Sequence, residues 1–180
     1  MRTRKLRRVA VLLTSALLTA ALLVPTVATS ATAASPTSCR VKNLKTGKVT
    51  KNLRKAVKTA RKGHRLTLRG TCHGSTYIGK SLRIRGVRTK TSGRPTLDAD
   101  ARGRVLTVKR GAKVILTDLR LREGKAKNGG GIWNSGKLIL KDSTVVGNIA
   151  TDYDNGYGGG VWNEGTLTLK GRSSIEGNTA

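Results

Sequence analysis

Apolar and polar residues alternate in short runs along the chain from residue 64 onward. The apolar members lie two positions apart, as in the pairs Leu106 and Val108, Val114 and Leu116, Leu119 and Leu121, Leu138 and Leu140, and Leu167 and Leu169. A period of two predicts strands that bury one face, because successive side chains of a strand point to opposite sides. Gly, Asn or Asp bounds each run, so we expect short strands joined by tight turns.

These runs belong to a repeated unit. The stretch G-G-G-I-W-N-S-G-K-L-I-L-K at 129–141 returns 29 residues later as G-G-G-V-W-N-E-G-T-L-T-L-K, and S-T-V-V-G-N-I-A at 143–150 returns 30 residues later as S-S-I-E-G-N-T-A. A weaker copy lies 24 residues upstream, where Val114 and Leu116 align with Leu138 and Leu140. Repeats of this length are typical of solenoids, in which each unit buries its apolar face against the next.

The repeat arranges the inward residues in three columns, each of which takes one residue from every unit. We expect the columns to be Ile84, Val108, Ile132 and Val161; Leu116, Leu140 and Leu169; and Leu97, Leu121, Val145 and Ile175. Equivalent strands of successive units would then stack in parallel, about 4.8 Å apart. Three columns predict a three-sided coil, which is a parallel β-helix.

A helical pattern precedes the strands, at residues 52–63. Its apolar residues recur at the spacing of one helix face: Leu53, Ala56, Val57 and Ala60. Asn52 or Thr50 can cap the start of the helix and Gly63 can end it. We therefore expect segment 34–63 to include a short amphipathic helix that covers the open N-terminal end of the stack.

The first 33 residues have the profile of a signal peptide. Five basic residues lie within positions 2–8, an uncharged and largely apolar run follows at 9–24, and Ala31-Thr32-Ala33 offers a cleavage site before Ala34. The run of 16 residues is shorter than the ~20 residues that span a bilayer, which disfavours the alternative of a membrane anchor. We expect a secreted protein, extracellular or associated with the cell wall, with no membrane span after cleavage.

Cys39 and Cys72 are the two cysteines of the chain. In a secreted protein they are expected to form a disulfide, which would attach the cap to the first coil. Zinc binding is not expected, because the cysteines lie 33 positions apart and the chain has two histidines, His64 and His73.

The repeat motifs carry a resemblance to a known family. With the T-L-R-G-T-C stretch at 67–72, the G-G-G-I-W-N and G-N-x-A units resemble right-handed parallel β-helix repeat proteins of the secreted bacterial type. These proteins have pectate-lyase-like folds and polymorphic-outer-membrane-type repeats. The resemblance covers about residues 40–180. It implies an all-β fold, with the parallel β-helix over 64–180, and it implies no single activity, because such stacks host lyases, hydrolases, adhesins and stalks.

The C-terminal end of the stack carries a separate expectation. The chain stops at Ala180, in register with Ala150, so the last coil would present an apolar cross-section and unpaired strand edges. A longer parent chain, or association of two copies through this end, would cover them.

The composition of the chain is strongly basic and poor in aromatic residues. The chain has 36 Lys and Arg against nine Asp and Glu. Without the five basic residues of the signal peptide, the net charge is still +22. With two Trp, three Tyr and no Phe, we expect an aliphatic core. An excess charge of this size favours binding to polyanions, although it also serves solubility.

The alternation turns many cations outward. Besides Arg83 and Arg85, the candidates for polyanion binding are Lys109, Lys113, Arg120, Lys137, Lys141 and Lys170. Because the chain shows no known nucleic-acid-binding motif and carries a secretion signal, we expect the partner to be an anionic polysaccharide or a cell-envelope polymer. Trp133 and Trp162 also turn outward on adjacent coils. They are candidates for glycan binding, or for simply covering the strands.

Carboxylates are few for catalysis or metal binding. Asp118 and Asp142 occupy equivalent turn positions with no third partner, and Asp98 and Asp100 are expected to be ion-paired loop residues beside arginines. In the D-Y-D-N-G stretch at 152–156, Asp152 and Asp154 are weak calcium candidates, because the EF-hand Gly and closing Glu are missing. We predict no catalytic residue, no metal site and no cofactor.

These observations predict a secreted, non-catalytic β-helix module that binds anionic polymers or glycans at the cell surface or outside the cell. Two alternatives stay open. One is an acidic-polysaccharide lyase or glycoside hydrolase of the pectate-lyase-like class, which a cluster of carboxylates on consecutive coils would favour. The other is a fragment of a larger β-helix protein without activity of its own.

Overall fold

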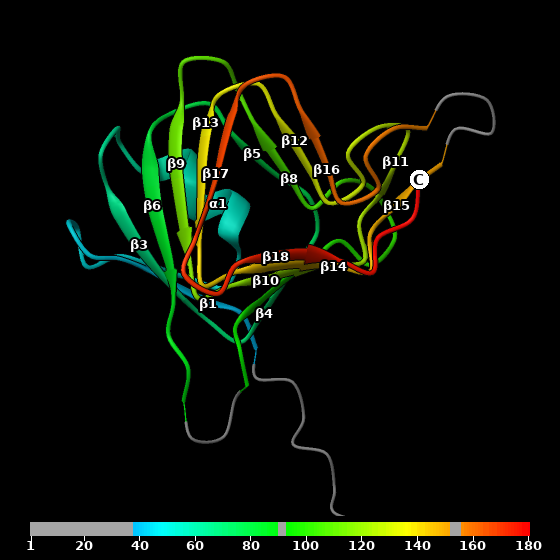
Figure 1. Ribbon diagram of the computed structural model, residues 1–180. Helices are drawn as coiled ribbons and strands as arrows, with labels where there is room; N and C mark the ends of the chain where they lie inside the picture. The colour runs from blue at the N-terminus through cyan, green and yellow to red at the C-terminus, as the bar shows by residue number, and fades with distance from the viewer. Residues whose placement is uncertain (1–37, 90–92, 152–155) are drawn as a thin grey trace, which may run out of the picture. The chain divides into compact units, whose positions relative to one another are not determined.

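The protein forms a β-solenoid in a computed structural model that describes residues 38–89, 93–151 and 156–180. Three parallel sheets, named here walls 1 to 3, surround one core (Figure 1). The predicted signal peptide, residues 1–33, and the weak calcium candidates Asp152 and Asp154 lie outside the described residues.

Each of the first four coils contributes one strand to each wall, and the fifth contributes strands to walls 1 and 2. Wall 1 contains β3 (Arg65–Arg69), β6 (Leu82–Gly86), β9 (Lys113–Thr117), β13 (Lys137–Lys141) and β17 (Thr166–Lys170). Wall 2 contains β4 (Thr71–His73), β7 (Thr96–Asp98), β10 (Arg120–Arg122), β14 (Thr144–Val146) and β18 (Ser174–Glu176). Wall 3 contains β5 (Thr76–Ile78), β8 (Leu106–Val108), β12 (Ile132–Asn134) and β16 (Val161–Asn163).

The remaining strands form two smaller groups outside the three walls. Between walls 2 and 3 in the chain, β11 (Lys125–Ala126) pairs in parallel with β15 (Ile149–Ala150). At the N-terminal edge of wall 1, β1 (Arg40–Asn43) pairs antiparallel with β3, and β2 (Val49–Thr50) pairs antiparallel with β1. This hairpin covers the edge of β3, whose backbone groups would otherwise be unpaired.

The strand register confirms two predicted columns and corrects the first. Leu116, Leu140 and Leu169 are partners in wall 1, and Leu97, Leu121, Val145 and Ile175 are partners in wall 2. In wall 3, however, Ile132 pairs with Leu106 and Val161.

The misplaced members of the first column were Val108 and Ile84. Val108 pairs with Asn134, and Ile84 belongs to wall 1, opposite Leu116. The sequence did not reveal the register of Val108, because its partner Asn134 is polar and yet fully buried. Its side chain is satisfied by Asn163 and the carbonyl of Thr166, so a polar residue takes an inward position.

The core is aliphatic, as the composition predicts. Its largest fully buried side chains are those of Leu and Ile, among them Leu66, Leu116 and Leu140. Within the described residues, no aromatic ring belongs to the buried core cluster. In the last coil the inward positions are open, since Leu169 is 46% exposed and Ile175 is 37% exposed.

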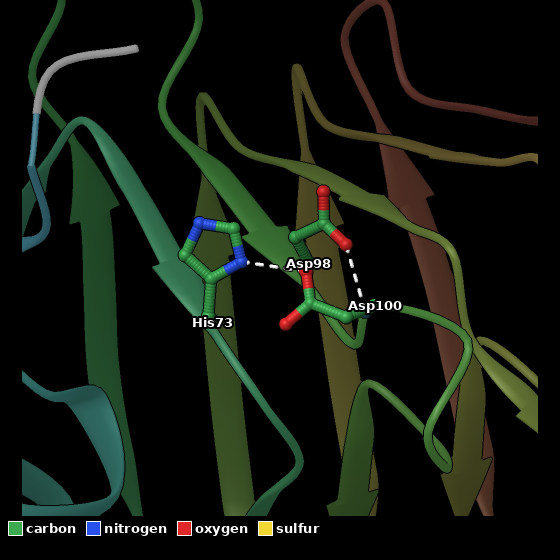
Figure 2. Close-up of side chains that lie close together, drawn as sticks. All are labelled: His73, Asp98 and Asp100. Atoms are coloured by element: carbon green, nitrogen blue, oxygen red, sulfur yellow. Dashed lines mark hydrogen bonds and ion pairs between the residues drawn. The ribbon is translucent and has the colours of Figure 1, made fainter.

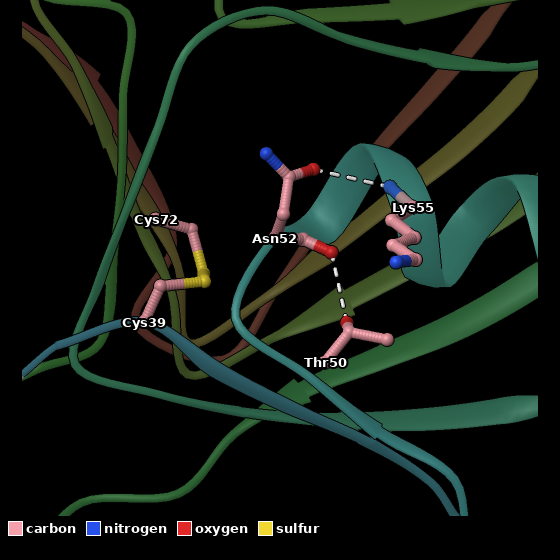
Figure 3. Close-up of a disulfide and its surroundings, with 5 residues drawn as sticks. All are labelled: Cys39, Thr50, Asn52, Lys55 and Cys72. Atoms are coloured by element: carbon pink, nitrogen blue, oxygen red, sulfur yellow. Dashed lines mark hydrogen bonds between the residues drawn. A yellow bond between two sulfur atoms is a disulfide. The ribbon is translucent and has the colours of Figure 1, made fainter.

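The predicted helix is present but shorter than expected. α1 covers Leu53–Thr59 and ends where Ala60 turns to extended backbone. Asn52 is the N-cap: its side chain accepts a hydrogen bond from the Lys55 N–H, 3.1 Å away. Thr50 instead donates its hydroxyl to the Asn52 carbonyl (Figure 3).

The helix covers the N-terminal part of the core. Its apolar face, Leu53, Ala56 and Val57, is buried in the same cluster as the coil residues, and α1 packs against β1, β2 and β5. In the view of Figure 1, α1 is seen through the opening between the three walls. Within the described residues, no helix is long and apolar enough to cross a membrane.

The predicted disulfide is confirmed. Cys39 and Cys72 are bonded, with their Cα atoms 4.6 Å apart (Figure 3). Cys72 points inward from β4, where it pairs with Leu97, and Cys39 immediately precedes β1. The bond therefore ties the N-terminal segment to wall 2.

Candidate anion-binding groove

A groove crosses the outward face of wall 1 on the first coils. Its main part has a volume of about 790 Å³ and lies over Thr67, Ile115 and Thr117. Two smaller hollows of about 570 and 250 Å³ adjoin it, and all three share Arg65 in their lining. They adjoin one another at Arg65, and we call the three hollows together the groove.

Strand alternation places the arginines of the groove. Leu66 and Leu68 of β3 and Leu82 and Ile84 of β6 point into the core and are at most 1% exposed. The residues between them therefore point outward. Arg65 is the register partner of Arg83, and Thr67 is the partner of Arg85. Because neighbouring strands lie about 4.8 Å apart, these arginines start from adjacent backbone positions.

The groove has a large excess of positive charge. Eight cations line its three parts: Lys45, Arg61, Lys62, Arg65, Arg83, Arg85, Arg88 and Lys113. The one carboxylate in the lining is Asp118, which lies 3.7 Å from the Arg88 guanidinium. Among the described residues, Arg65, Arg83 and Arg85 have no ion-pair partner. Like charges that line one groove repel one another, and a bound anion would relieve the repulsion.

Backbone packing places the Asp118 and Arg88 pair. Gly86 ends β6, and a Cβ atom there would collide with the carbonyl oxygen of Asp118. The missing side chain lets the turn at Asp118 lie directly against wall 1. Asp118 thereby reaches Arg88, and within the described residues it makes no ion pair with Arg65, Arg83 or Arg85.

The cations predicted from the sequence are exposed but do not all share one surface. Lys113, Lys137, Lys141 and Lys170 lie on the outward face of wall 1, where Lys113 pairs with Lys137 and Lys141 pairs with Lys170. Lys113 is the one that lines the groove. Lys109 follows β8 of wall 3, and Arg120 lies on wall 2.

Several groove residues were missed in the sequence. The R-L-T-L-R alternation at 65–69 was enough to place Arg65 outward. By contrast, Lys45, Arg61 and Arg88 lie outside the strands and the helix, and no periodic pattern assigns a direction to such a residue. Their convergence depends on how the hairpin and the helix pack against wall 1.

The two tryptophans are outward neighbours, as expected. Trp133 of β12 and Trp162 of β16 are register partners, and both are half-buried. Their indole N–H groups donate to the two carboxylate oxygens of Glu164, at 3.1 and 3.0 Å. The Arg104 guanidinium lies 4.7 Å from the Trp133 ring centroid, and the Tyr157 ring lies 5.5 Å from Trp162.

These contacts hold the indoles against wall 3. Trp133 also donates to the Ser135 hydroxyl, which itself donates to Glu164. Partial burial lowers the pKa of Arg104 from its usual range, and its guanidinium donates to the carbonyls of Gly129 and Asn128. The arrangement links adjacent coils, whereas glycan binding by the tryptophans stays a prediction.

Acidification should loosen the tryptophan pair. Hydrogen bonds from Trp162, Ser135 and Trp133 hold the pKa of Glu164 below its ordinary value. A lowered pKa in the folded state stabilises the fold above the ordinary pKa, and this contribution is lost as the pH falls through the lowered value. Because the chain has two tryptophans, their fluorescence reports on this site. We expect an emission change at a pH below the ordinary titration range of a glutamate.

Glu164→Gln provides the test of this pH dependence. This variant should show the altered emission already at neutral pH and lose the acid transition. The control Glu176→Gln, on wall 2, should keep it. An identical acid transition in Glu164→Gln and the unmodified protein would contradict the assignment.

A second cluster brings together His73, Asp98 and Asp100 on wall 2 (Figure 2). The Asp98 carboxylate is buried and accepts hydrogen bonds from the Arg122 guanidinium and the Asp100 N–H, each at 2.9 Å. His73 Nδ1 lies 2.7 Å from an Asp100 carboxylate oxygen. Although one ligand atom from each residue could face a metal ion, the adjacent Arg122 charge opposes a cation.

Asp98 is ion-paired, as expected, but with Arg122 rather than with an arginine that follows it in the sequence. Asp100 instead contacts His73. The cause is the strand register, since His73, Asp98 and Arg122 are neighbours on β4, β7 and β10. Asp98 also belongs to a strand rather than to a loop.

Asp118 and Asp142 behave as turn residues. Both adopt a positive φ, 55° and 49°, which Asp tolerates better than most residues. The Asp142 side chain accepts a hydrogen bond from the Arg172 N–H, and Asp118 pairs with Arg88. Their geometry therefore supports the structural interpretation rather than a catalytic pair.

The fold and the groove together define a basic β-solenoid protein with a cationic concave surface. Comparison with known proteins found no matching family model, no matching curated protein and no matching solved structure. The function is therefore argued from the groove itself.

Proposed function

We propose that this protein is a secreted, non-catalytic module that binds an anionic polysaccharide or cell-envelope polymer along the outward face of wall 1. One observation carries the proposal: among the described residues, eight cations and a single carboxylate line three adjoining hollows that share Arg65. Such an arrangement focuses a positive potential on a concave surface. We also propose that the repeats are of the right-handed, pectate-lyase-like type, on the basis of their motifs.

The rest of wall 1 extends the cationic surface along the solenoid. Beyond the groove, the outward lysines Lys137, Lys141 and Lys170 continue across β13 and β17. A linear polymer that lies across the strands would meet a new cation on most coils. The bound polymer would release counterions from this surface, so binding should depend strongly on salt.

Secretion is the other part of the proposal. The predicted signal peptide motivates it, and the Cys39–Cys72 disulfide supports it, because such bonds persist in oxidising compartments.

Salt-dependent binding is the first test. We expect the protein to bind sulfated and uronic-acid polymers, and the affinity to fall steeply from about 50 to 500 mM salt. Replacing Arg83 and Arg85 by Gln should lower the affinity at least tenfold and flatten the salt dependence. Isothermal titration calorimetry measures both effects.

The matched control removes two arginines elsewhere. Arg102 and Arg172 are exposed and lie outside the groove lining, so replacing them by Gln changes the net charge equally. We expect this variant to bind within about twofold of the unmodified protein. Equal losses in both variants would show diffuse charge attraction instead of a groove. Release of unsaturated sugars from the polymer would support the lyase alternative.

A further inference from the structure

Three arginines of the groove start from neighbouring positions on two adjacent strands and line one hollow; we call them the arginine cluster. Arg65 and Arg83 are direct register partners on β3 and β6, and Arg85 lies two residues along the same strand as Arg83. All three are exposed and line the same hollow. Within the described part of the chain they make no ion pair, so all their planar donor groups are available to a ligand.

The chemistry of this cluster is narrower than that of a general positive patch. We infer that Arg65, Arg83 and Arg85 form a subsite for a sulfate or phosphate ester group on the polysaccharide, an inference that rests on the proposed function. A monoester of either acid has three terminal oxygens arranged tetrahedrally. Three guanidinium groups can each donate hydrogen bonds to these oxygens. A carboxylate has two oxygens in one plane, and one or two arginines satisfy it.

The distribution of Arg and Lys on wall 1 supports this subsite. The three cations of the cluster are arginines, and Lys45, Lys62 and Lys113 line the hollows beside them. The outward cations on β13 and β17 are all lysines. Lysine acts as a point charge on a flexible chain, and arginine offers an oriented pair of donors. The wall therefore combines one site for oriented recognition with a lysine surface for non-directional attraction.

The remaining lining of the hollow suits a sugar carrier. Leu44 is 54% exposed, and Ile115 and Val87 are half-buried in the same hollow. These apolar side chains lie next to the arginines and offer contact to the apolar face of a sugar ring that carries the ester group.

The test compares three oligosaccharides of equal length and equal charge: a sulfated one, a phosphorylated one and an oligogalacturonate. We expect calorimetry at fixed ionic strength to show at least tenfold tighter binding of one or both esters than of the oligogalacturonate. The ester that binds more tightly shows whether the subsite prefers a sulfate or a phosphate group. Inorganic sulfate or phosphate should displace it more effectively than acetate.

Arg83→Lys separates oriented recognition from charge, because the variant keeps the positive charge and loses the planar donor pair. It should lower ester binding at least fivefold and change oligogalacturonate binding less than twofold. Arg172→Lys, outside the groove, should change neither affinity. Thermal unfolding of both variants checks that the fold is intact.

The outcomes distinguish this inference from the proposed function. Equal affinity for all three oligosaccharides, with no selective effect of Arg83→Lys, would overturn the ester subsite and leave polyanion binding in place. Absence of binding to any of them at low salt would overturn both.

Discussion

Leu140→Asp is expected to unfold the solenoid. Leu140 is fully buried between its register partners Leu116 and Leu169. An aspartate at this position would bury a carboxylate among aliphatic side chains without a partner, at a cost of about 4 kcal/mol or more. Since small domains are stable by only about 5–15 kcal/mol, the folded population should fall sharply. Urea denaturation followed by circular dichroism measures the change.

The neighbouring residue is the matched control. Ile139 lies on the same strand with its side chain outward, half-buried between Ile115 and Thr168. Ile139→Asp should cost about 1 kcal/mol. Leu169→Asp should fall between the two variants, because Leu169 points inward but is 46% exposed. Equal destabilisation by Leu140→Asp and Ile139→Asp would show that the strand does not bury one face.

Loss of the disulfide is expected to produce the second-largest change in stability. The bond closes a loop between positions 33 residues apart, which corresponds to about 3–4 kcal/mol by the loop-closure estimate. The double variant Cys39→Ala and Cys72→Ala removes the bond without adding a polar group to the core. Its melting temperature should fall by several degrees, and the amides of α1 should exchange faster with solvent.

Reduction of the unmodified protein gives an independent control for this prediction. It should cause a loss of stability similar to that of the double variant, and mass spectrometry should find no free thiol before reduction. Two alkylatable thiols in the folded protein, or an unchanged melting temperature after reduction, would contradict the expected role of the bond.

The repeat in the sequence was sufficient to predict the class of fold. Alternation in 64–180 identified the inward residues of walls 1 and 2, because burial on one face of a strand requires a period of two. The helix face of Leu53, Ala56 and Val57 was equally readable, and the two cysteines had one possible pairing. Each of these predictions depends on local periodicity or on counting.

The candidate site was only partly predictable. The outward direction of Arg83 and Arg85 followed from alternation, but their unpaired state did not. It depends on where the nine carboxylates lie in space. Asp118 pairs with Arg88 and Asp98 with Arg122, and neither pair could be recognised from its spacing along the chain.

The sequence by itself therefore determined a stack of short strands with an aliphatic core, a helical cap, a disulfide and a strongly cationic surface. The tertiary structure decided which residues meet across coils: Leu106 with Ile132, Arg65 with Arg83, and the turn cations with wall 1. The reason is that side-chain direction follows from the period of a strand. Contacts between coils depend instead on turn lengths, which vary from coil to coil, and on buried polar residues such as Asn134.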